Sequence, residues 1–455
     1  MEKRAMTRRR FMTGALAGAS SAVLAACAVT PQVVEKEVEK VVKETVVVEV
    51  EKLVTATLSP ELEGNIIYTW WGSGTRKVAR DKALELFADR YPRITVQSVQ
   101  ITANYKDKVL TMIAGGTPPD VMQTDNYDIT AYAAKGTARP LDDLVQRDSF
   151  DLSIFWPQSL EEPTWEGKLY GLPFMGSPRI VYFNKDLFDA AGVTTPDQLW
   201  EAGEWTWDAL IETANALTGR DASGNITQFG FQADTWHAAL APWIWQNDGQ
   251  MLSEDHKVFR ENEPEAVEAV AFQQGLIHKH RVAPKAEEQE GIDLFATGKL
   301  AMLVSWRGSC IVYRSYKFNW EVAPMPVGPQ RKVTLYKGNC MAMTSDSKQV
   351  DAAWTLMKFL ESKEADLLWV MAGDAVPTRI NLDVFMSSTP PTNNQYFFEP
   401  FEQDYAQFLP LNPHWPEWDT VVNQKLSRVF LENEDVGIVM DELKPEVEAI
   451  LAQPF

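Results

Sequence analysis

Two loops of this sequence combine an aromatic side chain with small and polar ones. Residues 71–75 follow a strand-like segment and read Trp-Gly-Ser-Gly-Thr, and the residues after Met122 read Gln-Thr-Asp-Asn-Tyr. A pyranose ring has apolar C–H faces and a rim of hydroxyl groups, so aromatic rings beside planar polar groups match both features. The chain also holds 16 tryptophans, more than core filling requires. This composition favours a ligand groove.

Residue types used in catalytic or metal sites are present without the spacing that such sites need. His278 and His280 stand two apart, on opposite sides of a helix, and the remaining histidines show no ligand spacing: His237, His256 and His414. The Gly-Ser-Gly at 72–74 lacks the Lys-Ser or Lys-Thr pair of a phosphate loop, and no Gly-x-Ser-x-Gly elbow occurs. The sequence predicts no metal, no cofactor and no enzymatic activity, while a Ser-His-Asp triad assembled by the fold stays open.

The first 26 residues read as an export signal. The twin arginine Arg8-Arg9 precedes an apolar run of small residues that ends at Cys27 and is too short to span a bilayer as a mature helix. The arginine pair resembles a Tat signal, and Leu-Ala-Ala-Cys resembles the lipobox of bacterial lipoproteins. We expect cleavage after residue 26 and lipidation of Cys27, giving an extracytoplasmic protein anchored to the membrane; a basic amphipathic N-terminus is the alternative.

Residues 27–60 are expected to act as a spacer behind the lipidated cysteine. The segment is rich in Val, Glu and Lys and has neither glycine nor aromatic residues, so it cannot build a core. A short coiled coil is the alternative, because several valines follow spacings of four and three. Cleavage removes five basic residues and one acidic residue, which takes the net charge from −20 to −24. Such acidity excludes nucleic acid as a partner.

The globular part opens with a strand, a helix and a second strand. Asn65–Trp71 and Ile94–Val99 are rich in β-branched residues, and Arg76–Tyr91 has apolar residues at helical spacing. This order predicts an α/β fold with a largely parallel sheet. Ligands of such sheets lie beyond the carboxyl ends of the strands, which is where both sugar-suited loops stand.

Five short motifs follow one another between residues 115 and 360. They are Gly115–Val121, Tyr182–Val193, Thr206–Thr218, Phe295–Met302 and Ala352–Leu360. In order, spacing and sequence they resemble the family 1 extracellular solute-binding proteins of ABC importers, and the resemblance covers residues 62–455. Thr206 also suits the N-cap of an amphipathic helix, so we expect that motif to be structural.

The resemblance implies a two-lobed periplasmic-binding-protein fold of type II, in which each lobe is a sheet flanked by helices and hinge crossovers join the lobes. The first lobe is expected over 62–175 and 335–388, and the second over 178–332 and 392–455. The implied function is to capture a carbohydrate in the interlobe cleft and deliver it to the membrane permease subunits of an ABC importer. The implied state is a monomer.

The resemblance also implies candidate ligand contacts around the cleft. They are Trp71, Ser73, Asp125, Asn126 and Tyr127 in the first lobe, Asp234, Trp236, Trp245 and Trp306 in the second, Gly338 near the hinge, and Arg379 and Trp418 towards the C-terminus. Trp418 is preferred over Trp415 as a stacking ring, and Asp374 is an alternative partner for Arg379. Because Trp243 and Trp245 stand two apart, we expect one of them to be core.

Other interpretations remain open at this stage. The same fold serves polyols and glycerol-phosphate-type solutes, but an anionic ligand needs several cations, and Arg307 and Arg379 are the evident ones. A neutral sugar or oligosaccharide is therefore favoured. A secreted glycoside hydrolase would need two carboxylates about 5 to 10 Å apart, and no residue pattern isolates such a pair. Cys310 and Cys340 are expected to be buried free thiols, with a disulfide between them as the alternative.

Overall fold

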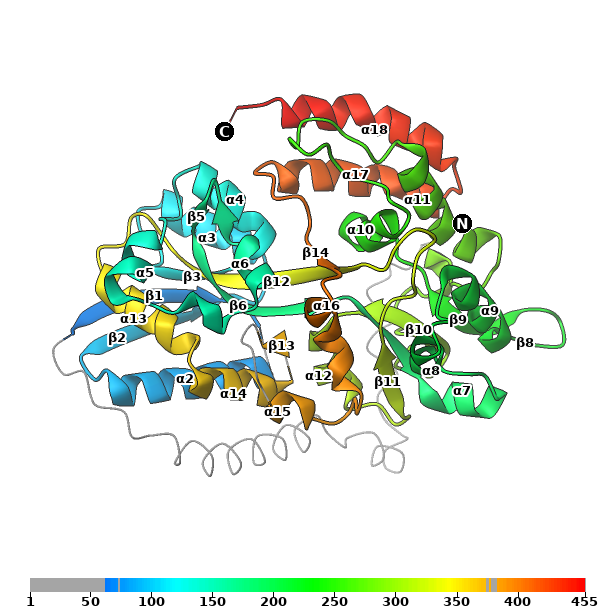
Figure 1. Ribbon diagram of the computed structural model, residues 1–455, viewed down its shortest axis with the longest axis horizontal. Helices are drawn as coiled ribbons and strands as arrows, with labels where there is room; N and C mark the ends of the chain where they lie inside the picture. Colours follow the sequence, from blue (N-terminus) through cyan, green and yellow to red (C-terminus); the bar gives the residue numbers. More distant parts are fainter. Residues whose placement is uncertain (1–61, 73, 374–375, 378–382, 455) are drawn as a thin grey trace, which may run out of the picture.

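The computed structural model describes residues 62–72, 74–373, 376–377 and 383–454 (Figure 1). The predicted signal peptide, Cys27 and the spacer lie outside this part of the chain, as do Ser73 and Arg379. The described residues form two lobes, each built on a β-sheet with helices packed on it. The predicted two-lobed α/β architecture is confirmed.

The sheet of the first lobe takes strands from distant parts of the chain. Their order is β13-β6-β12-β3-β1-β2, with β14 against β12. The bounds are β1 (Gly64–Trp70), β2 (Ile94–Gln100), β3 (Val121–Asp125), β6 (Gly171–Pro178), β12 (Thr334–Met343), β13 (Val376–Pro377) and β14 (Ala406–Gln407). Because β1 and β3 are parallel neighbours, Trp71 and Asp125 lie at the same edge of the sheet.

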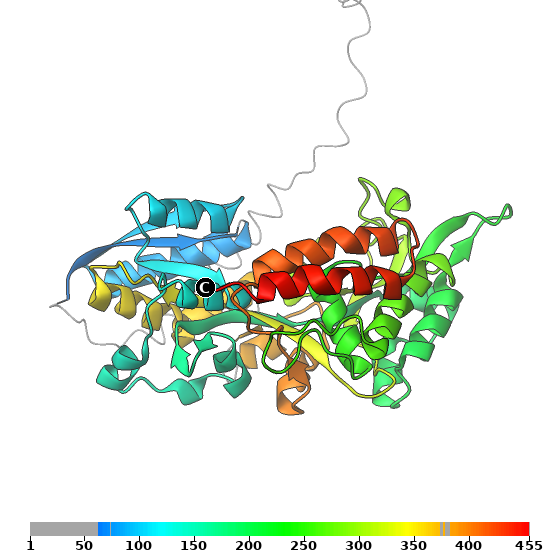
Figure 2. The ribbon, with the colours of Figure 1, turned by 90° about the horizontal axis from the view of Figure 1, so that it is seen from above.

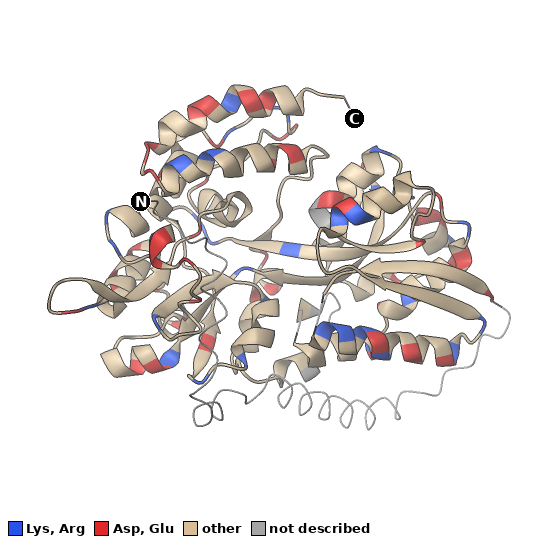
Figure 3. Ribbon diagram, turned by 180° about the vertical axis from the view of Figure 1, so that it is seen from behind, with Lys and Arg blue, Asp and Glu red and all other residues tan. Residues whose placement is uncertain are grey.

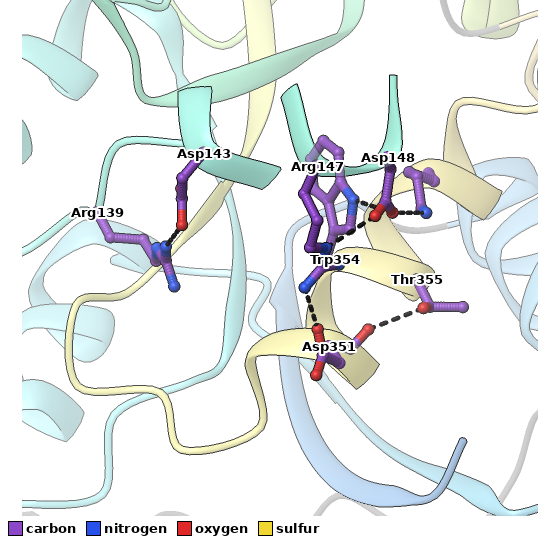
Figure 4. A network of polar contacts seen from close by, with 8 residues as sticks. Arg139, Asp143, Arg147, Asp148, Asp351, Trp354 and Thr355 are labelled. Atoms are coloured by element: carbon purple, nitrogen blue, oxygen red, sulfur yellow. Dashed lines mark hydrogen bonds and ion pairs between the residues drawn. The ribbon is translucent and has the colours of Figure 1, made fainter. Parts of the chain in front are cut away.

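Helices cover this first sheet and close its core. They are α2 (Thr75–Arg90), α3 (Tyr105–Ala114), α4 (Asn126–Ala134), α5 (Asp142–Asp148), η2 (Leu152–Ile154), α6 (Pro157–Glu161), α13 (Val350–Leu360), α14 (Lys363–Ala372) and α15 (Asp383–Met386), with a hairpin of β4 (Thr164–Trp165) and β5 (Lys168–Leu169). The predicted strand-helix-strand opening corresponds to β1, α2 and β2. Figure 4 shows how Asp148 joins α5 to α13: Trp354 Nε1 donates to its Oδ2 at 2.9 Å.

The second lobe has a five-stranded sheet in the order β11-β7-β10-β9-β8. Its strands are β7 (Ile180–Asn184), β8 (Gly219–Arg220), β9 (Ile226–Gln232), β10 (Leu300–Ser305) and β11 (Trp320–Ala323). Its helices are α7 (Lys185–Ala191), α8 (Pro196–Glu201), α9 (Trp207–Leu217), α10 (His237–Gln246), α11 (Pro264–His278), η3 (Ala286–Glu288), η4 (Arg307–Ser309), α12 (Cys310–Tyr313), α17 (Trp415–Phe430) and α18 (Val436–Leu451). Thr206 caps α9 as predicted, because its side chain accepts a hydrogen bond from the Ala209 N–H.

Within the described residues the chain crosses between the lobes three times. The first crossing runs from β6 into β7, the second enters β12, and the third passes through η5 (Asn394–Phe397) and α16 (Glu399–Glu402) to β14. The Arg179 N–H donates to the Leu335 carbonyl at 2.8 Å, which ties the first crossing to the second. The lobe limits expected near residues 175–178 and 332–335 stay predictions. Figure 2 shows α17 above the second lobe with its start directed to the first lobe, where it packs with α4.

Candidate functional site

The space between the lobes holds two neighbouring compartments. The first has a volume of about 190 Å³ and is lined by Trp71, Arg76, Gln123, Asp125, Met175, Gly176, Ser177, Trp306, Gly308, Lys337 and Asn339. The second has a volume of about 240 Å³ and is lined by Lys106, Asp128, Trp236, Ala238, Trp306, Leu335, Lys337, Leu409, Trp415, Pro416 and Asp419. Both lobes contribute to each compartment. Trp306 and Lys337 line both, so the compartments meet at these two side chains.

Adjacent strands of the first sheet set the polar groups of the first compartment. β3 and β12 are antiparallel, and their register places Asn339 opposite Asp125. Asn339 Nδ2 donates to Asp125 Oδ1 at 2.7 Å, and Lys337 Nζ lies 3.4 Å from the same oxygen. Gln123 Nε2 approaches Asn339 Oδ1 at 3.4 Å. The compartment therefore offers fixed amide and carboxylate groups of the kind that orient sugar hydroxyls.

The aromatic wall of the first compartment is Trp71, at the end of β1. Its ring meets Tyr105 edge to face, with centroids 4.8 Å apart. The Tyr105 hydroxyl is in turn 3.0 Å from the Thr69 hydroxyl. Packing against Tyr105 fixes the plane of Trp71 beside the polar groups of β3 and β12.

A buried arginine supports the aromatic rings of the second compartment. Arg179 lies between β6 and β7 with 3% of its surface exposed, and its Nη2 donates to Asp234 Oδ1 at 2.5 Å. Its guanidinium lies 5.7 Å from the Trp236 ring centroid and 5.3 Å from that of Trp306. Trp243 Nε1 donates to the other Asp234 oxygen at 2.8 Å. Cation–π contacts with the same guanidinium therefore position both tryptophan rings.

A charged histidine lies behind Trp415 and Asp419, two lining residues of the second compartment. His237 is fully buried, with Nδ1 2.7 Å from Asp419 Oδ1 and Nε2 2.7 Å from Glu261 Oε1. Two carboxylates accept from the ring, so both nitrogens carry protons. Burial disfavours the imidazolium, yet the carboxylates raise the pKa of His237 to about 9. The Trp415 ring stacks on the imidazole with centroids 5.3 Å apart, so His237 orients both Trp415 and Asp419.

Cationic and acidic side chains balance along the two compartments. The lining holds three of each kind: Arg76, Lys106 and Lys337, and Asp125, Asp128 and Asp419. Lys106 pairs with Asp128, and Lys337 with Asp125. Burial raises the pKa of Asp128, and the neighbouring Lys106 opposes that shift. This balance suits an uncharged, hydroxyl-rich ligand better than an anion.

The structure brings part of the predicted contact set together at the compartments. Trp71, Asp125 and Trp306 line the first compartment, and Trp236 and Trp306 line the second. Asn126 and Tyr127 begin α4, directly after Asp125. Gly338 is buried in β12 between the lining residues Lys337 and Asn339.

Other predicted contacts lie elsewhere, and the preference for Trp418 is corrected. Trp418 is fully buried, with its ring against His237. Trp415 begins α17 and lines the second compartment, as does Asp419 one turn later, because residues four apart share a helix face.

Asp234 and Trp245 are corrected in the same way. Asp234 is buried as the partner of Arg179, since an arginine at this depth needs a carboxylate. Trp245 is 2% exposed and borders a separate pocket with residues 250–254, 256 and 407–411. Trp243 is buried as well, so both tryptophans of α10 are core. Arg307, considered as a cation for an anionic ligand, is buried under Phe385 and Phe397.

Sequence reasoning missed several polar lining residues and the two buried charges behind the rings. The missed lining residues are Arg76, Lys106, Gln123, Asp128, Ser177, Lys337 and Asp419, and the two buried charges are Arg179 and His237. Lys337 and Asn339 could have been found from their position, because they stand on either side of the predicted contact Gly338 in the same strand. Cys310 and Cys340 are buried free thiols.

No cluster of three or more His, Cys, Asp or Glu side chains is arranged to hold a metal ion in the described part of the chain. No helix among the same residues is both long and apolar enough to cross a bilayer.

Known proteins share both the sequence pattern and the fold. Residues 72–366 match the model of the bacterial extracellular solute-binding protein family. A binding protein of Brucella abortus is 24% identical over 353 residues, which cover 76% of this chain and 82% of that protein. An ABC substrate-binding protein of Listeria monocytogenes, solved with cycloalternan, superposes with a TM-score of 0.77 at 26% identity over 85% of this chain and 98% of that one.

UgpB of Mycobacterium tuberculosis, solved with glycerophosphocholine, superposes with a TM-score of 0.73 at 20% identity, covering 86% of this chain and 98% of that one. The match to the family model extends over well more than half of the chain. Together with the two lobes and the cleft between them, it confirms the predicted membership. The chain belongs to the bacterial extracellular solute-binding protein family.

Proposed function

We propose that this protein captures a neutral carbohydrate between its lobes and delivers it to the membrane permease of an ABC importer. The observation that carries the proposal is the pairing of aromatic walls with fixed, charge-balanced polar groups in both compartments. Trp71, Trp236 and Trp306 provide faces for sugar rings, and Asp125 and Asn339 provide partners for hydroxyls. Each such polar contact contributes on the order of 1 kcal/mol, so several are needed for useful affinity.

The proposed mechanism is closure by differential affinity. A sugar that contacts both lobes at once stabilises the closed form, because only in that form do both walls reach the sugar. Moving a population from mostly open to mostly closed takes about 5.5 kcal/mol of preference for the closed form. The closed form is then the one that the permease recognises, and no chemical step is required.

The location proposed for the protein rests on its first 60 residues. A Tat-type signal of 26 residues, lipidation of Cys27 and a spacer to residue 60 would tether the two lobes outside the cytoplasmic membrane. We propose a monomer without cofactor or enzymatic activity. Gel electrophoresis of the protein made with and without Cys27→Ser, after labelling with a radioactive fatty acid, tests the anchor.

A glycerol-phosphate-type solute is the second candidate. The observation in its favour is the presence of Arg76, Lys106 and Lys337 in the lining. Against it stand Asp125 and Asp128, which pair with two of these cations. A phosphodiester would have to compete with both carboxylates.

A thermal-shift screen of the purified protein separates the candidates. The panel contains neutral mono- and disaccharides, polyols, sn-glycerol 3-phosphate and glycerophosphocholine. A ligand at a hundred times its dissociation constant adds about 2.7 kcal/mol to the free energy of unfolding, which raises the melting temperature visibly. We expect the largest shift from a neutral sugar that stays intact on long incubation. A shift from the phosphates alone supports the second candidate, and hydrolysis of the sugar indicates a glycoside hydrolase.

A further inference from the structure

We infer that the ligand is a carbohydrate of at least two sugar units, with one unit in each compartment. This inference rests on the proposed function and adds the size of the substrate to it. It comes from the division of the cleft at Trp306 and Lys337, which line both compartments.

The volumes support a ligand that spans both compartments. The first measures about 190 Å³ and the second about 240 Å³. Sites for small molecules occupy roughly 300 to 1,000 Å³. Neither compartment reaches the lower limit alone, whereas the two together exceed it.

Each compartment also has its own aromatic ring and its own carboxylates. The first has Trp71 at the end of β1 with Asp125 from β3. The second has Trp236, with 43% of its surface exposed, and Asp419 from α17. A sugar ring needs one face to stack on and at least one polar group for its hydroxyls, and each compartment supplies both.

Contacts on both sides of the junction hold Trp306 and Lys337 where they can separate two sugar rings. Trp306 lies with Arg179 beneath it at 5.3 Å, and Arg179 is fixed by Asp234. Lys337 faces it from β12 and pairs with Asp125. A single ring placed in either compartment would leave the aromatic face and carboxylates of the other in water, so a two-unit ligand gains contacts that a one-unit ligand forgoes.

Calorimetric titration of the full-length protein tests the inference. Each disaccharide is compared with its own monosaccharides: maltose and cellobiose with glucose, lactose with glucose and galactose, and xylobiose with xylose. We expect the tightest disaccharide to bind at least tenfold more tightly than either of its monosaccharides. A monosaccharide that binds as tightly as every disaccharide containing it would overturn the inference and leave the proposed function standing. Failure of all neutral sugars to bind would overturn both.

Two single variants test the assignment of one unit to each compartment. Trp71→Ala and Trp236→Ala should each weaken disaccharide binding by about tenfold or more, while any monosaccharide responds to only one of them. Trp165→Ala is the matched control, because Trp165 lies in the β4–β5 hairpin and lines neither compartment. Disaccharide affinity that is lowered by one of the two variants and untouched by the other contradicts the inference. Circular dichroism of each variant confirms that it folds.

Discussion

At the scale of single residues, the contact groups of this cleft are held from behind by buried charges. Arg179 supports Trp236 and Trp306, and His237 supports Trp415 and Asp419. A sugar offers many weak contacts, so affinity depends on groups that lose little freedom on binding. Because buried charges fix these side chains before the ligand arrives, the side chains lose little freedom on binding.

His237 gives the protein a specific pH dependence. Its pKa is about 9 in the folded protein and 6.5 without the folded environment. A raised folded pKa means that the stabilisation is complete below pH 6.5 and is lost as the pH rises through 9. We expect this residue to lower the free energy of unfolding by up to about 3 kcal/mol between pH 6.5 and the region above 9.

Nuclear magnetic resonance titration of the imidazole measures this pKa directly, since the chain has only five histidines. Urea unfolding at pH 6.5 and pH 9.5 measures the loss of stability. Asp419→Asn removes the negative charge of one of the two carboxylates that accept from His237, so it should lower the pKa of His237 and reduce the pH dependence. A pKa near 6.5 in the unmodified protein would show that the carboxylates do not hold the proton.

At the scale of elements, the sequence predicted the helices and strands that depend on residues close together in the chain. The β1-α2-β2 opening and the capped helix α9 follow from β-branched runs, helical periodicity and Thr206, all readable within a few residues. The positions of Trp71 and Asp125 followed because ligand loops stand at the carboxyl ends of parallel strands.

The remaining parts depend on partners far apart in the chain. Arg179 and Asp234 are 55 residues apart, and His237 and Asp419 are 182 apart. No local pattern connects such pairs. The resemblance favours Trp418 over Trp415, because Trp418 matches the family's stacking aromatic more closely. The two tryptophans are three residues apart, and the sequence does not show that the start of α17 turns Trp415 towards the cleft.

The crossing from β6 to β7 supplies the element-scale prediction. Arg179→Lys keeps the charge but loses the flat guanidinium that contacts two rings and bonds both Asp234 and the Val304 carbonyl. We expect about tenfold weaker sugar binding, which corresponds to about 1.4 kcal/mol, measured by calorimetry. Arg139→Lys, at a surface ion pair with Asp143, should leave affinity unchanged. Equal affinities for both variants and the unmodified protein would remove Arg179 from its positioning role.

At the scale of the whole molecule, the lobes and their charges fit a role in capture. Acidic residues are spread over the outer helices of both lobes, α18 among them (Figure 3). The cleft itself is charge-balanced, so the acidic surface does not extend into the place proposed for the ligand. Three crossings within the described residues join the lobes, and two of them are tied at Arg179 and Leu335. Movement of the lobes would therefore be transmitted directly to the strands that line the cleft.

The most direct test of a sugar site between the lobes is calorimetric titration of the Trp236→Ala/Trp306→Ala double variant with the neutral sugar that stabilises the unmodified protein most. Both rings face the second compartment, and Trp306 also faces the first. We expect at least a hundredfold loss of affinity, about 2.7 kcal/mol, in a variant whose circular dichroism spectrum is unchanged. Affinity within a factor of two of the unmodified protein would place the sugar elsewhere and contradict the account.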